Sequence, residues 1–322
     1  MKKVIIQSDS YDISTDSIIN WLYYLNPNIE ILKLFNEHRI KDFILKLSNS
    51  EELNLSINGG KISYLDKYWY RRGRFSFDNY FLSDDFSQFE KKAARENLTK
   101  ILEFIQNIQF KNAINKYSDN KIDKLEMLNC CKKCDLKIPD TIVTNSYIKL
   151  KYFIRKHKQV ISKPIQYPIL EYEQYNETIF FSTKTELVTE ENLDSFSSSF
   201  LPSLFQQYID KKFEIRSFFI NEKFYSMAIF SQENPKTKID FRDYDYERPN
   251  RTVPFKLPQK IEKKLSNLMK NLNMNSGSLD IIYTPNHEYV FLEVNPVGQF
   301  QWLSYHCNYF IEKIVAKILI DE

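Results

Sequence analysis

The sequence predicts a mixed α/β protein with a small parallel sheet at its N-terminus. Three observations favour this class. Strand and helix patterns alternate at the start of the chain, which is typical of parallel strands joined by helices. Further along, β-branched apolar runs follow one another across short turns, as in antiparallel hairpins. The length of 322 residues allows two or three domains with separate cores.

The first predicted domain covers residues 1–117. Its expected elements are strands at 2–8, 29–35, 53–58 and 62–72 and helices at 16–25, 41–47 and 84–110. In the last helix, apolar residues recur at helical spacing from Phe86 to Ile105. The polar stretch 116–120 interrupts that pattern and marks the predicted boundary.

Two further domains are predicted, at 118–195 and 196–322. The expected elements of the second are helices at 122–134 and 147–156 and strands at 141–144, 159–164, 169–174 and 178–187. Those of the third are a strand at 203–209, hairpins at 214–230 and 278–294, and helices at 258–272 and 306–320. Residues 231–252 hold two prolines and many charges, which predicts a polar loop.

Composition excludes several classes of function. The chain has five glycines, whereas average usage would give roughly twenty. They form neither G-x-G-x-x-G nor G-x-x-x-x-G-K-[ST], so Rossmann and P-loop nucleotide binding are excluded as motifs. The net charge of +3 is too small to indicate a nucleic-acid or membrane surface by itself.

The N-terminus and the cysteines predict a cytoplasmic, reduced protein. The start of the chain fits neither a signal peptide nor a membrane helix, and no apolar run approaches about 18 residues. Cys130, Cys131 and Cys134 share one predicted helix, which does not suit a disulfide framework. Cys131 and Cys134 have the spacing of half a metal site, but thiols packed as small apolar groups are the favoured interpretation.

Asp280, Glu293 and Asn295 give the strongest chemical signal. Residues 284–287 form a predicted turn, so the two carboxylates fall on adjacent antiparallel strands, and Asn295 shares a face with Glu293. Mg²⁺ prefers such oxygen ligands, usually together with phosphate oxygens. A pair of solvent-facing acids is the alternative. It fits poorly, because the neighbouring residues of both strands are apolar.

Two other segments indicate a bound nucleotide. Lys163 follows an apolar strand pattern, and a half-buried lysine needs an anion such as phosphate. A structural lysine whose amine reaches solvent is the alternative. Residues 204–209 end a predicted strand, where exposed backbone groups can bind an adenine edge. Glu214 follows Gln207 by seven residues and can accept hydrogen bonds from ribose hydroxyls.

Arginine is scarce, with ten residues against thirty-five lysines. Seven of the ten form two groups: Arg71, Arg72, Arg74, Arg216, Arg242, Arg248 and Arg251. A planar guanidinium is preferred where a carboxylate or phosphate is held at two points. The alternative for each residue is random placement on the surface.

Together and in this order, these segments resemble the ATP-grasp superfamily. The resemblance covers the chain beyond about residue 117. It rests on Asn120-Lys121, the segment 136–145, Lys163, the hinge from Gln207 to Glu214, Glu214-Ile-Arg216, Asp280 and Glu293-x-Asn295. Tyr68-Trp-Tyr-Arg-Arg-Gly73 is similar to a segment of the ATP-grasp peptide maturases that make graspetides, which are microviridin-like ω-ester peptides. The subgroup that it resembles most is the grasp-with-spasm type, and residues 295–302 are similar to the segment after that family's metal ligands.

The resemblance implies an ATP-grasp fold with a pre-ATP-grasp domain (1–117), a central subdomain (118–195) and a C-terminal subdomain with the metal site (196–322). It implies a ligase that uses ATP and Mg²⁺ to phosphorylate Asp or Glu side chains of a precursor peptide. These would be joined to Ser/Thr hydroxyls or Lys amines as macrocyclic esters or amides. The implied partners are the leader and core of that peptide, and a second copy of the chain in a homodimer.

The resemblance also implies a role for individual residues. Asp280, Glu293 and Asn295 would bind the metal, and Arg216 and Arg242 would be the catalytic groups that hold the substrate carboxylate and the acyl phosphate. The implied nucleotide-binding residues are Lys121, Lys163, Gln206, Gln207, Tyr208, Ile209, Glu214 and Leu292. Lys124 also fits the phosphate-binding position for which Lys121 is favoured.

Two other functions stay open. One is a carboxylate–amine ligase, similar to glutathione synthetase or to enzymes that modify ribosomal proteins, acting on a small molecule or a protein terminus. The W-Y-R-R segment argues against it. The other is a non-catalytic protein that binds ATP or a peptide, and the intact metal triad argues against that.

Overall fold

The computed structural model describes residues 3–49, 54–78, 86–108, 110–165, 169–174, 177–182, 185–193 and 199–321, without the side chains of 121, 169–174, 177–182 and 199. Contacts divide the chain into two units. The first is Met1–Lys121, Met274–Ser276 and Pro296–Glu322, and the second is Ile122–Asn273 and Gly277–Asn295. This division differs from the three predicted domains, because the second and third share one unit and the last 27 residues return to the first.

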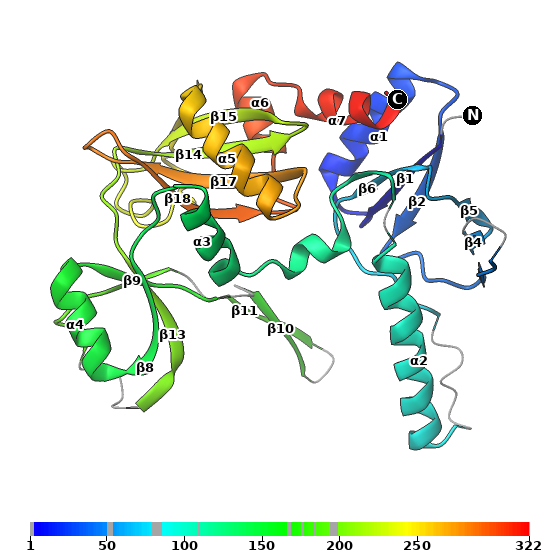
Figure 1. Cartoon of the computed structure of the whole chain (residues 1–322), viewed down its shortest axis with the longest axis horizontal. Coiled ribbons are helices and arrows are strands. Elements are labelled where there is room, and N and C mark those ends of the chain that lie inside the picture. The colour runs from blue at the N-terminus through cyan, green and yellow to red at the C-terminus, as the bar shows by residue number, and fades with distance from the viewer. Residues whose placement is uncertain are drawn as a thin grey trace. The chain divides into compact units, whose positions relative to one another are not determined.

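The first unit is built on a parallel sheet (Figure 1). Its strands are β1 (Lys3–Ser8), β2 (Glu30–Phe35), β6 (Lys67–Tyr70) and β7 (Asn112–Ile114). They lie in the order β2-β1-β6-β7, and all neighbours are parallel. The run from Val4 to Ile6 in β1 is fully buried, as expected for a parallel sheet covered on both faces. The predicted N-terminal parallel sheet is therefore confirmed.

Three helices of this unit come from opposite ends of the chain. They are α1 (Ile13–Leu25), α6 (Gln301–Cys307) and α7 (Ile311–Ile320). Helix α7 packs against α1, and the Lys313 ammonium lies 4.9 Å from the ring centroid of Trp21. The single helix predicted over 306–320 is wrong. Asn308 and Phe310 both have φ of +52°, which a right-handed helix does not accommodate.

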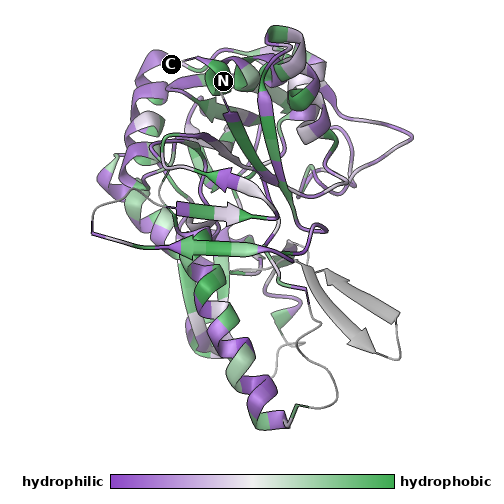
Figure 2. Cartoon of the chain, turned by 90° about the vertical axis from the view of Figure 1, so that its right-hand side faces the viewer, coloured by the Kyte–Doolittle hydropathy of each residue, from purple (hydrophilic) through white to green (hydrophobic). Residues whose placement is uncertain are grey.

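A small antiparallel sheet and a long helix complete the first unit. The sheet has the order β3-β4-β5, from β3 (Phe43–Lys46), β4 (Asn54–Ile57) and β5 (Gly60–Ile62). The helix predicted at 41–47 is therefore wrong, because a short apolar run does not distinguish helix from strand and pairing with β4 decides. The strand predicted at 62–72 is divided between β5 and β6. Helix α2 (Gln88–Gln106) carries hydrophilic and hydrophobic residues along its length, as an amphipathic pattern predicts (Figure 2).

The second unit contains two larger sheets. One has the order β12-β9-β13-β8, with β8 (Thr141–Ser146), β9 (Val160–Ser162), β12 (Glu186–Val188) and β13 (Ser199–Gln207). The other has the order β16-β15-β14-β17-β18, with β14 (Phe213–Ile220), β15 (Lys223–Phe230), β16 (Arg251–Phe255), β17 (Ser276–Tyr283) and β18 (Tyr289–Asn295). Strands β10 (Ile169–Gln174) and β11 (Glu177–Ser182) pair only with each other among the described strands. The strand predicted at 178–187 is thus divided between β11 and β12.

Helices cover both of these sheets. Helix α4 (Tyr147–His157) packs on the first sheet through Leu150, Phe153 and Ile154, which share a core with Phe205 of β13. Helices α3 (Lys124–Lys133) and α5 (Gln259–Asn271) contact each other, and α3 also contacts β18. No helix of the described residues combines the length and the apolar character that crossing a membrane requires.

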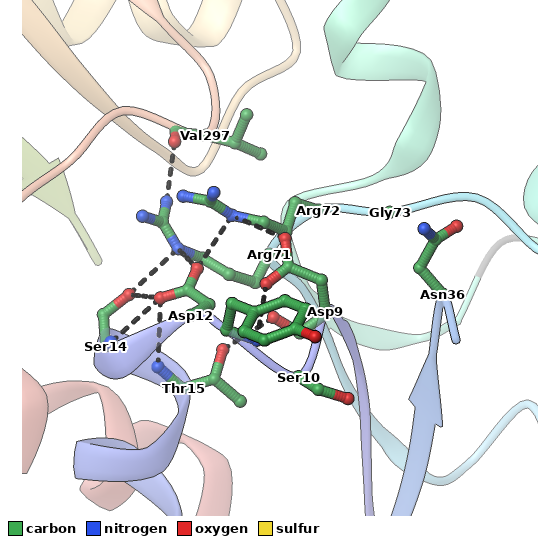
Figure 3. Close-up of polar contacts among 12 residues, drawn as sticks. Asp9, Ser10, Asp12, Ser14, Thr15, Asn36, Arg71, Arg72, Gly73 and Val297 are labelled. Carbon is green, nitrogen blue, oxygen red and sulfur yellow. Dashed lines mark hydrogen bonds and ion pairs between the residues drawn. The ribbon is translucent and has the colours of Figure 1, made fainter. Parts of the chain in front are cut away.

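A buried ion pair stabilises the end of the parallel sheet in the first unit (Figure 3). Arg71 directly follows β6, and its Nε donates to Asp12 Oδ2 at 2.8 Å. Its Nη1 donates to the carbonyl oxygens of Val297 at 2.6 Å and Gly298 at 3.2 Å. Burial works to raise the pKa of Asp12, but Arg71 and the hydrogen bond from Ser14 hold it below the usual value. Arg71 thus has a structural role.

We expect Asp12→Ala to destabilise the first unit by about 3–5 kcal/mol, because it leaves a buried guanidinium without its counter-charge. Asp9→Ala is the matched control. Asp9 lies 3.7 Å from the half-exposed Arg72, and pairs of this kind contribute only about 0–1 kcal/mol. Urea unfolding followed by circular dichroism measures both variants. Equal losses would contradict a special role for the buried pair.

Candidate active site

One cleft in the second unit collects most of the predicted site residues. It lies among the end of β13, the β17–β18 hairpin and the loop between β15 and β16. The predicted residues that line it are Lys163, Gln207, Tyr208, Ile209, Glu214, Arg242, Asp280, Leu292 and Glu293. They come from segments far apart in the sequence, so the fold brings the nucleotide and metal candidates to one place.

The β17–β18 hairpin places the predicted metal ligands side by side. Asp280 pairs directly across the strands with Glu293, and Ser278 pairs with Asn295. The next pair is Ile281 with Phe291, which leaves Leu292 as an extra residue in a β-bulge. Because the bulge interrupts the alternation of side chains, Leu292 and Glu293 both line the cleft.

Asp280 is held by a guanidinium from the neighbouring strand. Arg216 lies on β14, and its Nη1 is 2.8 Å from both carboxylate oxygens of Asp280. The amide nitrogen of Asn295 is 3.5 Å from Asp280 Oδ2. Burial raises the pKa of Asp280, and Arg216 opposes that rise. Arg216 is therefore a direct partner of a predicted metal ligand.

Glu293 is surrounded by cations. Arg242 Nη1 lies 3.4 Å from its Oε1, and Lys124 Nζ lies 3.8 Å from its Oε2. Burial works to raise the pKa of Glu293, but Lys163, Lys124 and Arg242 together hold it below the usual value. Burial also lowers the pKa of Lys163 to about 8, although Glu293 favours its charged form. The site thus combines ionised carboxylate with an excess of positive charge, which suits an anionic ligand.

Arg242 is fixed by an acid of its own loop. Its Nε and Nη2 donate to the two oxygens of Asp240, at 2.9 and 2.7 Å. Asp240 also accepts a hydrogen bond of 3.2 Å from Thr185 Oγ1. Because the contact with Glu293 uses Nη1, Arg242 joins the loop to the β17–β18 hairpin through separate nitrogens.

The end of β13 forms another wall of the cleft. The Gln207 N–H donates to the carbonyl of Asp140, and the Tyr208 N–H donates to that of Gln159. These bonds fix the strand end and direct the chain toward Ile209, which lines the cleft. The side chain of Gln206 is not brought into the cleft. It is fully buried, and its Nε2 donates to Thr141 Oγ1 at 2.9 Å.

Among the lysines, the structure brings Lys124, the alternative to Lys121, to Glu293, and it adds Lys211 to the site. Lys121 ends the 3-10 helix η2 (Tyr117–Lys121), and its side chain lies outside the described part of the chain. Lys124 begins α3, contacts Glu293 and donates to the Pro164 carbonyl at 2.8 Å. Lys211 was not predicted, although it lies three residues before Glu214, and its Nζ is 2.8 Å from the Glu214 carboxylate.

The donor set of the hairpin fits Mg²⁺. Two carboxylates and one amide supply hard oxygen ligands on neighbouring strand positions. Within the described residues no three Asp, Glu, His or Cys side chains form a metal-binding group, so phosphate oxygens or water would complete this set. The clustered cysteines lie elsewhere. Cys131 and Cys134 are buried, and burial raises the pKa of the Cys131 thiol to about 12.

Comparisons with known proteins come from solved structures, since no protein-family model and no curated protein matches the chain. A RiPP-associated ATP-grasp ligase from Chryseobacterium gregarium, solved with ADP and a leader and core peptide, is 24% identical with a TM-score of 0.82. The match covers 100% of this chain and 97% of that one.

Two further structures show the same likeness. Macrocyclase MdnC from Microcystis aeruginosa MRC, bound with precursor peptide MdnA, is 24% identical, with a TM-score of 0.76 and coverage of 99% and 100%. ATP-grasp ligase PsnB, complexed with a variant of its minimal precursor, Mg and ADP, is 14% identical, with a TM-score of 0.73 and coverage of 99% and 98%. The chain therefore has the ATP-grasp fold over essentially its whole length, as the order of its motifs predicted.

Proposed function

We propose that this chain is an ATP-dependent ligase that cyclises a ribosomally made precursor peptide. It would phosphorylate Asp or Glu side chains and join them to Ser or Thr hydroxyls, or to Lys amines, as ω-esters or ω-amides. The observation that carries this proposal is the convergence of Asp280 and Glu293 with four cations, Lys124, Lys163, Arg216 and Arg242. The likeness to ligases solved with nucleotide and peptide supports it.

The first step needs positioning and charge neutralisation more than a protein nucleophile. A carboxylate oxygen of the peptide attacks the γ-phosphorus of ATP, the bond to the β,γ-bridging oxygen breaks, and ADP leaves with that electron pair. Lys163 and Lys124, both near Glu293, would neutralise the phosphate oxygens. Asp280, Glu293 and Asn295 would hold Mg²⁺, which would supply further neutralisation of the phosphates.

The second step closes the ring. The peptide hydroxyl oxygen, or the amine nitrogen, bonds to the acyl carbon, and the bond from that carbon to the phosphate oxygen breaks. Inorganic phosphate leaves, and the proton of the nucleophile passes to the departing phosphate or to a carboxylate. Arg242 is half-exposed beside Glu293, so it can stabilise charge on the acyl phosphate as the bonds change. Each ring removes the atoms of one water from the peptide.

The cleft also suggests how the rest of the nucleotide binds. Backbone groups from Gln207 to Ile209 would contact the adenine edge, and Leu292 would pack on the base from the bulged strand. Glu214 would accept hydrogen bonds from the ribose hydroxyls. The remaining features of the proposal are a peptide with separate leader and core segments, a homodimer and a cytoplasmic location.

Co-expression with a precursor tests the proposal. The substrate would be a short peptide rich in Thr or Ser and in Asp or Glu, encoded beside this gene. We expect mass spectrometry to show losses of water with the parent chain and none with Glu293→Gln. A peptide whose core acids are replaced by alanine is the matched substrate control. An unmodified peptide, together with ATP hydrolysis that depends on a small amine, would favour the alternative carboxylate–amine ligase.

Lys163 gives a prediction for nucleotide binding. We expect Lys163→Met to weaken ATP binding about tenfold or more, because a charge-assisted contact with phosphate is lost. The parent should bind ATP less tightly as the pH rises through about 8, since Lys163 loses its charge there. The variant should show little change over the same range. Calorimetric titrations between pH 7 and 9 measure both, and a parallel pH dependence in the two proteins would exclude Lys163 as the titrating group.

A further inference from the structure

Lys211 is a buried cation in the cleft for which the proposed reaction has no task. It lies in the loop between β13 and β14, and it is 7% exposed, whereas its neighbour Lys212 is exposed. Burying an ammonium group is costly unless it is paired and hydrogen-bonded. Its partners should therefore show what the residue does.

Both partners of Lys211 belong to the nucleotide side of the cleft. Its Nζ donates to Glu214 Oε1 at 2.8 Å and to the carbonyl oxygen of Ile239 at 2.9 Å. The other carboxylate oxygen of Glu214 accepts a hydrogen bond of 2.5 Å from Ser231 Oγ. The Ile239 carbonyl thus fixes the ammonium, and the ammonium and the hydroxyl fix the carboxylate.

These contacts favour the ionised form of the Glu214 carboxylate. Glu214 is 6% exposed, and burial raises its pKa, while Lys211 and Ser231 oppose the rise. Each oxygen of an ionised carboxylate has capacity for more than one hydrogen bond, so both can still accept one from a ligand hydroxyl. A neutral carboxylic acid would be a poorer acceptor, because hydrogen bonds to a charged group are stronger.

We infer that Lys211 is a positioning residue that holds the Glu214 carboxylate in place to accept hydrogen bonds from ribose hydroxyls. This inference rests on the proposed function, because it assigns the ribose to Glu214. It adds that affinity for the ribose depends on a lysine that need not contact the nucleotide. Lys211 therefore determines how well the site distinguishes a ribonucleotide from a nucleotide that lacks the 2′ and 3′ hydroxyls of the sugar.

Ribose discrimination tests the inference. We expect Lys211→Met to weaken ATP binding about tenfold and 2′,3′-dideoxy-ATP binding less than twofold, because only ATP has hydroxyls for Glu214. Lys212→Met is the matched control, and it should bind both nucleotides as the parent does. Lys211→Arg should recover most of the discrimination, since it restores a cation beside the carboxylate. The affinities are measured by calorimetry without peptide.

A double-mutant cycle separates this role from a merely structural one. If Lys211 acts through Glu214, Lys211→Met should cause little further loss of ATP affinity in a Glu214→Gln background. The double variant buries no unpaired charge, so it stays informative if Lys211→Met alone does not fold.

Two results would overturn the inference while the proposed function stands: equal losses for ATP and the dideoxy nucleotide, or additive effects in the cycle. A parent chain that binds no ATP would overturn both.

Discussion

Asp280→Asn and Glu293→Gln are each expected to lower peptide turnover about a thousandfold or more, which corresponds to roughly 4 kcal/mol of transition-state stabilisation. Each substitution keeps the size of the side chain but removes the charge of a proposed Mg²⁺ ligand on the β17–β18 hairpin. The two residues are direct cross-strand partners, so loss of either should disrupt the same ion site. We therefore expect similar losses for both variants.

The measurement is turnover of a precursor peptide with Mg²⁺ as the only divalent ion. Glu288→Gln is the matched control, because Glu288 lies beyond the cleft in the same hairpin and pairs with Lys137 at the surface. Thermal unfolding should be recorded alongside, since Arg216 loses its charged partner in Asp280→Asn. Near-parent turnover in both folded variants would refute the assignment of the metal site.

Arg216→Lys and Arg242→Lys are expected to lower turnover at least about tenfold, roughly 1.4 kcal/mol, while ATP affinity stays within a few-fold of the parent. A lysine keeps the charge but does not hold a carboxylate at two points. Arg216 contacts both oxygens of Asp280 through one nitrogen, Nη1. Arg242 holds Asp240 with two nitrogens and Glu293 with a third.

The two variants should be measured side by side with Arg248→Lys, which changes an arginine of the same loop outside the cleft lining. We expect the control to behave as the parent. Loss of ATP affinity equal to the loss of turnover would indicate that these arginines serve nucleotide binding instead. Turnover that survives both substitutions would show that a single positive charge suffices at each position.

The sequence by itself determined the parts of the site that depend on local patterns. A short predicted turn between two apolar runs was enough to place Asp280 and Glu293 on adjacent antiparallel strands, and the observed pairing of β17 with β18 agrees. The apolar strand before Lys163 identified a lysine that lies in the cleft. The alternation of elements likewise predicted the parallel sheet. In each case, the pattern of apolar and polar residues is a local property, so an element can be recognised before its partners in the fold are known.

Tertiary structure decided the features that depend on distant partners. Residues 43–46 form a strand because β4 pairs with them. Residues 296–322 belong to the first unit, where Arg71 binds the carbonyls of Val297 and Gly298. The partner of Arg216 is 64 residues away in the sequence. The bulge at Leu292 and the burial of Lys211 also left no pattern in the sequence. Strand register and burial depend on which elements pack together, and that choice is made by the whole fold rather than by any local segment.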